Sequence, residues 1–421
     1  MKNQWKFLVS SLVVTTVTFG CATAAAQTDL AAPAQIRHQQ VTIGSTTPTP
    51  TFRTLVNFDG ANGANTHFGV IEGKDGNLYG TSSGGGANGS GVLFELTPGG
   101  TLTVLYNFCA ETGCTDGKGP DGLTLGSDGN LYGVTASGGA FGYGTVFKFA
   151  GVGSPVTLHN FDGTDGSGAF GLVQASNGDF YGATSYGANF IECTGNGCGT
   201  VFKMTPSGTF TTLHDFCSQP DCADGAVLYE YLTRGTDGNF YGTTFGGGTT
   251  NCGTVFRITP KGDLTTIYTF GLEYYPFCGG NPLGLALGTD GNFYGVTTDY
   301  PGAVFKITPK GELTTIYNFC AQIGCTDGAL PRVGLTLGSD GNFYGTTYNG
   351  GTHNEGTIFN ITPSSVLTTL HSFDGKDGSY PIGGLFQATN GTFYGTTTIG
   401  GSGGDGTIFS LSVGLGSPEG R

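Results

Sequence analysis

Charged residues are scarce in this chain, and so are histidine, tryptophan and methionine. Of its 421 residues 11% are charged, and there are six histidines, two methionines and one tryptophan. So little charge argues against a protein built from amphipathic helices, which are rich in Ala, Glu, Lys and Leu. Glycine and phenylalanine are abundant instead, with 80 and 31 copies. The composition therefore predicts an all-β protein with enough apolar material for a large core.

Basic residues are scarcer than acidic residues. Lysine and arginine number 16 against 30 acidic residues, a formal charge of −14, and loss of Lys2 and Lys6 with an export signal would make it −16. Such a surface repels phosphate backbones, so we expect no nucleic-acid partner. The acidity is explained well enough by the need to keep a glycine-rich exported protein in solution.

The chain also lacks a catalytic signature. One loop contains Gly84-x-Gly86-x-x-Gly89, which has the form of a dinucleotide-binding fingerprint. That fingerprint requires a helix after the glycines, whereas here the next element is a predicted strand. We expect no nucleotide site and no cofactor.

Long apolar runs are absent after the N-terminus. Two lysines, an apolar run over residues 7–14 and the small residues 22–26 resemble a secretory signal, so residues 1–26 are predicted to be a signal peptide. This run is too short for a stable anchor, and the mature chain should contain no transmembrane segment. As an alternative, Cys21 after Gly20 is a candidate lipidation site. The protein should be secreted, periplasmic or on the surface of a bacterial cell.

The rest of the chain divides by composition. Residues 27–50 are polar and end in Thr-Thr-Pro-Thr-Pro, which predicts a disordered linker. Residues 51–413 carry the repeats described below, and residues 414–421 form a short tail without apolar character.

The phrase Asp-Gly-Asn-(Leu/Phe)-Tyr-Gly recurs seven times with small variations. Successive copies are 49 to 60 residues apart, about the length of one blade of a β-propeller. The tyrosines of the seven copies are Tyr79, Tyr132, Tyr181, Tyr241, Tyr294, Tyr344 and Tyr394.

Each repeat contains four phrases with strand composition. In chain order they are a (Gly-Leu-x-Leu), b (Asn-Phe-Tyr-Gly-Thr-Thr), c (Gly-Thr-Val-Phe) and d (Leu-Thr-Thr-Leu-Tyr-Asn-Phe). All are short, rich in β-branched and aromatic residues, and bounded by Gly, Pro, Asn or Asp. Asp-Gly between a and b, and Thr-Pro-x-Gly between c and d, suit tight hairpins. The pattern predicts four antiparallel strands per repeat.

The two ends of the repeat region are offset. A d phrase at residues 52–58 precedes any a phrase, and the last repeat stops after its c phrase at Leu411. If the first strand pairs beside the last one, every blade has four strands and the ring is closed. The sequence therefore predicts a seven-bladed β-propeller, which we expect to be a monomer.

These phrases resemble the GloVer tandem repeats of exported bacterial proteins. The similarity rests on Gly-Ser-Asp-Gly-Asn-Phe-Tyr-Gly-Thr-Thr, Gly-Thr-Val-Phe-Lys-Ile-Thr-Pro and Leu-Thr-Thr-Leu-Tyr-Asn-Phe, and covers roughly residues 52 to 412. The resemblance implies export and repeats, and it brings no catalytic residues.

The connections between strands differ in length. The a–b and c–d turns are short and uniform, whereas the b–c and d–a loops are long and variable. Because strands alternate in direction, both kinds of long loop should emerge on one face, where we expect binding.

Ten cysteines remain after the signal. Three pairs follow d strands, one lies in a b–c loop, and export favours disulfides over metal binding. A zinc site needs four converging ligands, and we expect these pairs to lie on separate blades. The predicted pairs are Cys109–Cys114, Cys193–Cys198, Cys217–Cys222, Cys320–Cys325 and Cys252–Cys278.

The d–a loops carry Asp-Gly pairs. Paired carboxylates could hold Ca²⁺, but no complete calcium-loop sequence is present, and turn chemistry explains the aspartates. Three histidines, His159, His214 and His371, stand where other repeats have a d-strand tyrosine and are expected to pack in its place.

The residues just before the a strands should form the mouth of the central channel. Most are Gly, Pro or apolar, and neutral drift at a solvated rim would explain the exceptions. We nevertheless take the polar and aromatic exceptions as the candidate ligand site: His67, Asp121, Tyr229, Glu230, Tyr231 and Arg332.

Three functions fit these observations. The first is a non-enzymatic exported propeller whose loop face binds a polysaccharide or a protein at the cell surface, with sugar stacking on rim aromatics such as Tyr186, Tyr300 and Tyr348. The second is an enzyme, a lyase or hydrolase of sugars or lactones, with acid–base groups at the channel mouth. The third is a structural envelope protein without a site. We favour binding, because a fold alone confers no activity.

Overall fold

The b and c phrases form strands that are buried on both faces. In the fourth repeat, all five residues of β15 (Phe240–Thr244) and four of the five in β16 (Thr254–Ile258) are buried, whereas the d strand β17 (Leu264–Thr269) is half-exposed. An unbroken run of Thr, Val, Ile, Phe and Tyr suits this double burial. Burial therefore falls from the middle of each sheet toward its outer edge.

The structure is a computed structural model that describes residues 49–188, 193, 195–271 and 280–416. These residues belong to one compact unit that spans residues 47–421. The expected signal peptide, most of the expected linker and the last five residues lie outside the described ranges.

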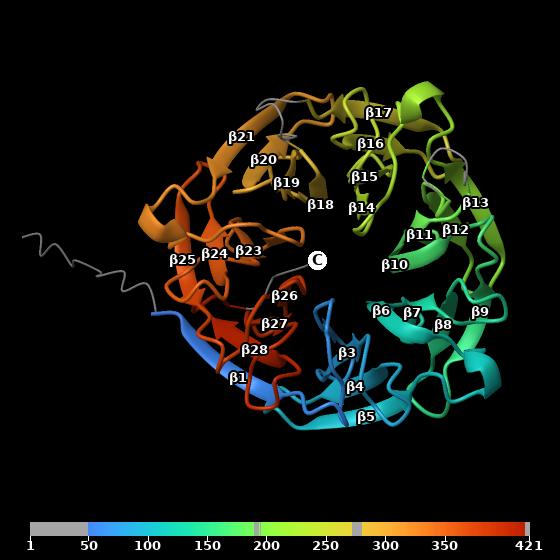
Figure 1. Ribbon diagram of the computed structural model, residues 1–421, viewed down its shortest axis with the longest axis horizontal. Coiled ribbons are helices and arrows are strands. Elements are labelled where there is room, and N and C mark those ends of the chain that lie inside the picture. Colours follow the sequence, from blue (N-terminus) through green and yellow to red (C-terminus); the bar gives the residue numbers. More distant parts are fainter. Residues whose placement is uncertain (1–48, 189–192, 194, 272–279, 417–421) are drawn as a thin grey trace, which may run out of the picture. The chain divides into compact units, whose positions relative to one another are not determined.

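The described strands form seven four-stranded antiparallel sheets, so the predicted seven-bladed β-propeller is confirmed. Within each sheet the strands run from the centre of the ring outward in the order a, b, c, d (Figure 1). Blades 1 to 3 comprise β2 (Ile71–Glu72), β3 (Leu78–Ser82), β4 (Val92–Leu96) and β5 (Leu102–Asn107); β6 (Lys118–Leu125), β7 (Leu131–Ser137), β8 (Thr145–Phe149) and β9 (Val156–Asn160); and β10 (Ser167–Gln174), β11 (Phe180–Tyr186), β12 (Thr200–Met204) and β13 (Phe210–Asp215).

Blades 4 to 7 follow the same pattern. They comprise β14 (Thr233–Arg234) with β15, β16 and β17; β18 (Pro282–Leu287), β19 (Phe293–Thr297), β20 (Ala303–Ile307) and β21 (Leu313–Asn318); β22 (Thr336–Leu337), β23 (Phe343–Thr347), β24 (Thr357–Ile361) and β25 (Leu367–Ser372); and β26 (Phe386–Gln387), β27 (Phe393–Thr397), β28 (Thr407–Ser412) and β1 (Thr51–Asn57).

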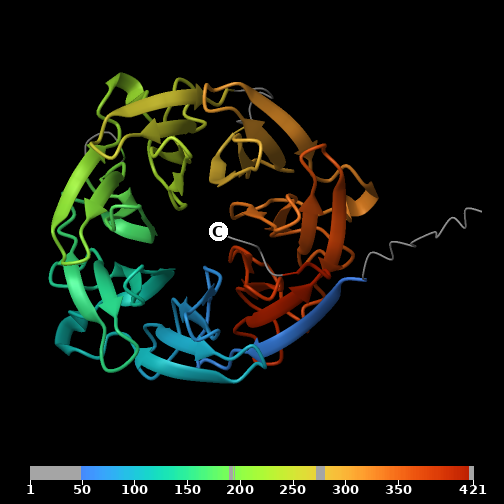
Figure 2. The same ribbon diagram turned by 180° about the vertical axis from the view of Figure 1, so that it is seen from behind.

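The seventh sheet takes its outer strand from the beginning of the described chain. β1 pairs antiparallel with β28, and the register places Phe52 opposite Leu411 and Asn57 opposite Thr407. In both views of the ring, the blue strand β1 lies along the outer edge of the red blade (Figures 1 and 2).

Helix is almost absent from the described residues. It consists of three single turns of 3₁₀-helix in the cysteine-bearing loops: η1 (Thr112–Cys114), η2 (Pro220–Cys222) and η3 (Ile323–Cys325). In the part of the chain that the structure describes, none of these turns approaches the length needed to cross a membrane.

The repeated tyrosine joins neighbouring blades. Its ring packs on the aromatic ring at the start of the next b strand, with centroids 4.0 or 4.1 Å apart at five of the seven blade interfaces: Tyr132–Phe180, Tyr181–Phe240, Tyr241–Phe293, Tyr294–Phe343 and Tyr344–Phe393. At the other two interfaces a leucine, Leu131 or Leu78, shares a cluster with the tyrosine. Each such pair contributes packing energy beyond the area that it buries.

The Asp-Gly-Asn turn orients that tyrosine. In blade 4 the Asp237 carboxylate accepts hydrogen bonds from the Asn239 backbone N–H (3.1 Å), the Asn239 side-chain amide (2.7 Å) and the Tyr241 hydroxyl (3.0 Å). One carboxylate thus closes the turn and fixes the ring that reaches the next blade. This explains why the whole phrase recurs as a unit.

A conservative substitution separates these two contributions. Tyr241→Phe keeps the ring but removes the bond to Asp237, so it should lower the free energy of unfolding by about 1 kcal/mol. Tyr394→Phe is the matched control, because no hydrogen bond of its hydroxyl to another described residue is seen. Denaturant unfolding of both variants checks this; equal losses would contradict the role given to the Asp237 bond.

Candidate functional site

The long loops meet on one face of the ring. Isolated backbone bridges join the d–a loop to the following b–c loop in four blades: Ala64 to Gly84, Ala226 to Gly246, Ala329 to Asn349 and Ser379 to Ile399. The shared face for the two kinds of variable loop therefore agrees with the prediction from strand alternation.

Glycines narrow the channel below this face. The first residue of the a phrase is glycine in six blades, and these backbones approach closely; a Cβ on Gly284 would lie 2.6 Å from the Cα of Gly334. The seventh position is Tyr231, and a Cβ on Gly171 would overlap its ring. We call this level, formed by Tyr231 and the six glycines, the neck.

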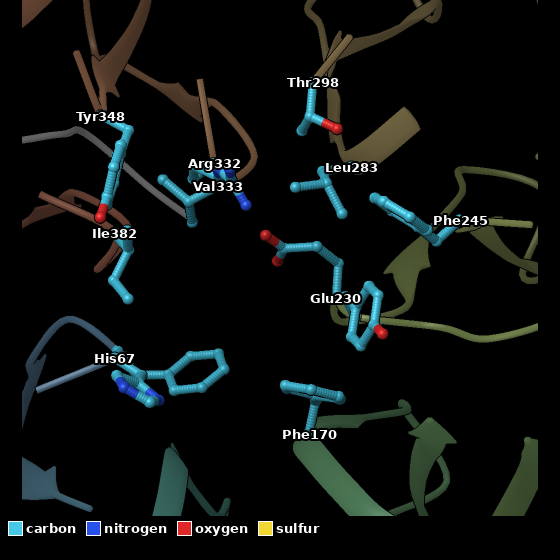
Figure 3. A pocket seen from close by; sticks show the side chains of 12 residues that line it. His67, Phe170, Glu230, Phe245, Leu283, Thr298, Arg332, Val333, Tyr348 and Ile382 are labelled. Carbon is cyan, nitrogen blue, oxygen red and sulfur yellow. The ribbon is translucent and has the colours of Figure 1, made fainter. Parts of the chain in front are cut away.

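A cavity of about 470 Å³ lies above the neck, on the loop face (Figure 3). Its lining comes mainly from the two residues that precede the neck position in every blade except blade 2, and from the first residues of three b–c loops. The lining residues are His67, Phe68, Phe170, Tyr229, Glu230, Phe245, Leu283, Thr298, Arg332, Val333, Tyr348 and Ile382.

The length of the inner strand decides which blades contribute most to the cavity. In blades 1, 4, 6 and 7 the a strand has only two residues, and the segment before it follows no regular strand geometry. These segments supply His67, Tyr229, Arg332 and Ile382. Blades 2, 3 and 5 have inner strands of six to eight residues.

Glu230 presents a buried carboxyl group to the cavity. Its residue exposure is 7%, and its carboxyl group projects into the open space between the walls (Figure 3). Burial raises the pKa of Glu230 to about 7, although the Gly334 backbone N–H donates to Oε1 at 3.2 Å and opposes the rise. The group therefore changes charge near neutral pH.

Asp121 holds the equivalent position in blade 2. It is also 7% exposed, and its pKa lies well above the usual range because of burial and because the negative charge of Glu230 is near. The pKa of the Tyr231 hydroxyl is raised by burial and by both carboxylates. Asp121, Glu230 and Tyr231 thus form one electrostatic group at the neck.

The other polar side chains stand at the rim. The Arg332 guanidinium lies over the Tyr348 ring, with Cζ 5.3 Å from its centroid. His67 is exposed to the cavity, and the protein around it displaces water and lowers the pKa of its imidazole. Tyr229 is half-buried, and its hydroxyl lies 3.3 Å from that of Tyr186.

The structure brings the predicted site residues together. Four of the six, His67, Tyr229, Glu230 and Arg332, line the same cavity, and Asp121 interacts with Glu230. Tyr231 lines a second cavity of about 310 Å³ on the other side of the neck.

The apolar walls were missed by the sequence analysis. Phe170, Leu283 and Val333 occupy the same position before the neck as Glu230, and Phe245 begins a b–c loop. The register that identifies the polar residues also identifies these positions, but an apolar residue there resembles core in the sequence.

Four predicted disulfides are present: Cys109–Cys114, Cys193–Cys198, Cys217–Cys222 and Cys320–Cys325. Cys252 is also disulfide-bonded, while its expected partner Cys278 lies outside the described residues. The expectation that cysteine pairs would stay apart is wrong for one pair of bridges. The b–c loop of blade 3 packs on the following d–a loop, so the sulfurs of Cys193, Cys198, Cys217 and Cys222 all lie within 4.8 Å of one another.

The loop aspartates accept hydrogen bonds within their own loops. Asp224, for example, accepts from the His214 ring nitrogen at 3.0 Å and from the Ser218 N–H and hydroxyl at 3.1 and 2.8 Å. His159 and His371 make the same contact to Asp165 and Asp377, as tyrosines do in blades 1 and 5. These bonds account for the aspartates as loop-forming residues.

Comparison with known proteins supports the repeat assignment. The model of the Gloeobacter/Verrucomicrobia repeat matches residues 34–234 and 194–409, which together cover most of the chain. This confirms the resemblance predicted from the repeated phrases. No curated protein sequence matches the chain.

Solved structures share the fold at low identity. A catalytically inactive virginiamycin B lyase from Staphylococcus aureus with quinupristin is 18% identical, with a TM-score of 0.58 over 86% of this chain and 99% of that one. The extracellular domains of two B. thetaiotaomicron proteins, described as a hybrid two-component and a one-component system, are 14% and 12% identical, with TM-scores of 0.56 and 0.57. This chain covers 41% and 40% of their length and is itself covered to 86% by each.

Burial of Glu230 should make stability depend on pH. Its pKa is about 7 against 4.5 for a free glutamate, so the folded state holds an extra proton between these values and stability falls as pH rises through them. Glu230→Gln removes this dependence and should be more stable than the native chain by about 3 kcal/mol above pH 7, with no gain below pH 4.5.

Denaturant unfolding on both sides of this pH window checks the prediction. Glu312→Gln, at an exposed glutamate in a c–d turn, is the control and should match the native chain at both pH values. A Glu230→Gln difference that is the same at both pH values would show that the carboxyl group does not titrate as stated.

Proposed function

We propose that this chain, which belongs to the Gloeobacter/Verrucomicrobia repeat family, is an exported binding protein that holds a small ligand in the cavity above the neck. The observation that carries the proposal is the cavity itself. At about 470 Å³ it has the size of typical small-molecule sites, and like them it combines apolar walls with a few convergent polar groups.

Export is supported by independent features. Four described disulfides and the bonded Cys252 suit an oxidising compartment, and two structures with the same fold are extracellular domains. With the predicted signal peptide at residues 1–26, these features favour a secreted, periplasmic or surface protein. Lipidation at Cys21 stays the alternative mode of attachment.

The ligand proposed from the sequence is a carbohydrate or a protein segment. Tyr229, Phe245 and Tyr348 supply flat rings at the cavity, and such rings stack on sugar faces. Two further rim tyrosines were named above as possible stacking residues. Tyr186 contacts Tyr229, and Tyr300 is 69% exposed. Binding needs no cofactor, and calcium in the Asp-Gly loops stays a separate prediction.

Catalysis is the second candidate, because one observation favours it. A carboxyl group with a pKa of about 7 is suited to exchange protons at neutral pH, and His67 and Arg332 line the same cavity. A structure with the same fold is a lyase, which makes elimination or hydrolysis of a sugar or lactone the reaction class to test. Loss of turnover with retained binding in Glu230→Gln would favour the enzyme.

A ligand screen tests the binding function. The purified chain is titrated calorimetrically against polysaccharides, oligosaccharides and small metabolites, and Phe245→Ala should weaken any ligand of the cavity at least about tenfold. Lys261→Ala, in a c–d turn on the opposite face, is the matched control and should leave affinity unchanged.

Two results would contradict the proposal. Ligands that bind both variants equally would lie elsewhere on the surface. Binding of nothing in the screen would favour the structural envelope protein.

A further inference from the structure

We infer that the ligand of this cavity is an organic cation, a ring compound that directs a protonated amine toward Glu230 and Asp121. The inference rests on the proposed binding function and specifies its ligand class. It is drawn from the charges, walls and floor of the cavity.

The two carboxyl groups lack a cationic partner. Across the described residues, lysine ion pairs are found at Asp128 and Asp290, on the turns of other blades, and neither Asp121 nor Glu230 takes part in one. Both are more than nine-tenths buried, and Glu230 points into the open cavity. A buried carboxylate is costly unless it takes up a proton or a positive charge compensates it. A cationic ligand would supply that charge.

The walls around Glu230 suit an organic cation. Phe68, Phe170, Tyr229 and Phe245 form a continuous chain of ring contacts, with successive centroids 5.9, 6.0 and 5.2 Å apart. Aromatic faces attract ammonium groups and also pack against an apolar ring. Hard metal ions instead prefer oxygen ligands, and these walls are mainly aromatic and aliphatic.

The floor of the cavity fixes the direction of the ligand. Phe68 lines the cavities on both sides of the neck, and its ring meets Tyr231 edge to face with centroids 5.2 Å apart. This pair lies between the two cavities, so a ligand that enters from the loop face ends at the neck. Its deepest group then lies at Glu230, whose carboxyl group is near that of Asp121.

The positive charge of Arg332 stays at the rim. Its guanidinium is held over the Tyr348 ring and forms no ion pair with a described carboxylate. An amine at the floor and an oxygen at the rim would match both charges of the cavity.

Two amines with neutral analogues test the inference. The native chain is titrated calorimetrically with 2-phenylethylamine and with glucosamine, and in parallel with 2-phenylethanol and N-acetylglucosamine. At least one amine should bind, and its neutral analogue should bind at least about tenfold more weakly. The arylalkylamine and amino-sugar arms distinguish the two sources of the same chemistry.

Three variants show where the charge acts. Glu230→Gln should weaken the amine by about 30-fold or more and leave the neutral analogue unchanged. Phe245→Ala should weaken both. Asp121→Asn is the second charge variant and should weaken the amine in the same direction.

Affinity should also follow the ionisation of Glu230. From about pH 6 to about pH 8 the native chain should bind the amine more tightly, and Glu230→Gln should lose most of this dependence. The other groups that face Glu230 are Asp121, Tyr231, His67 and Arg332. His67 has a lowered pKa and titrates in the same direction.

The outcomes separate the two proposals. If the neutral analogues bind as well as the amines, or Glu230→Gln has no effect while Phe245→Ala does, the cavity binds ligands but the cationic class is wrong. If none of the four compounds binds, the cationic class is wrong. If a compound binds but Phe245→Ala changes nothing, the binding function itself fails at this site.

Discussion

The stacking of one tyrosine per repeat on the next blade is the contact on which the ring depends. In five repeats the aspartate of the Asp-Gly-Asn turn fixes the orientation of this ring, and in all seven a Phe or Leu at the start of the next b strand packs against it. Turn, strand and interface therefore belong to one short phrase. A repeat that keeps this phrase keeps its place between its neighbours, whatever its loops contain.

The candidate site is formed by residues that do not hold the blades together. The b, c and d strands hold the ring together, so the residues just before the a strands are not needed for its stability. In four blades these residues do not adopt strand geometry. Seven similar repeats can then present dissimilar residues at one level. At the neck, Tyr231 stands where the other six blades have glycine, and its ring closes the channel. Glu230 and Asp121 place negative charge directly beside it.

The architecture could be predicted from the sequence because the patterns that determine it are local. Strand composition, turn residues and the position of the repeated tyrosines predict four strands in each of seven blades, and the structure has them. The six candidate residues were found by register alone, since equivalent positions in a ring converge on the axis. The apolar walls were missed, because Phe170 or Val333 at such a position resembles core in the sequence.

Other features depend on contacts that no local pattern encodes. The length of each inner strand could not be predicted, because it depends on how far the preceding segment departs from the sheet. The approach of Cys193 and Cys198 to Cys217 and Cys222 follows from the packing of two loops that are separated by two strands. The high pKa of Glu230 follows from burial in the folded ring, which its neighbours in the chain do not indicate.

The place of β1 in the seventh sheet has a consequence for biosynthesis. Six sheets can assemble from contiguous segments as the polypeptide emerges, but the last needs its first and final strands together. Until translation reaches residue 412, β1 and its apolar Phe52 lack the neighbouring strand β28 with which β1 forms backbone hydrogen bonds. An exposed strand edge favours pairing with other chains, so the nascent protein is most vulnerable to aggregation while β28 is still missing.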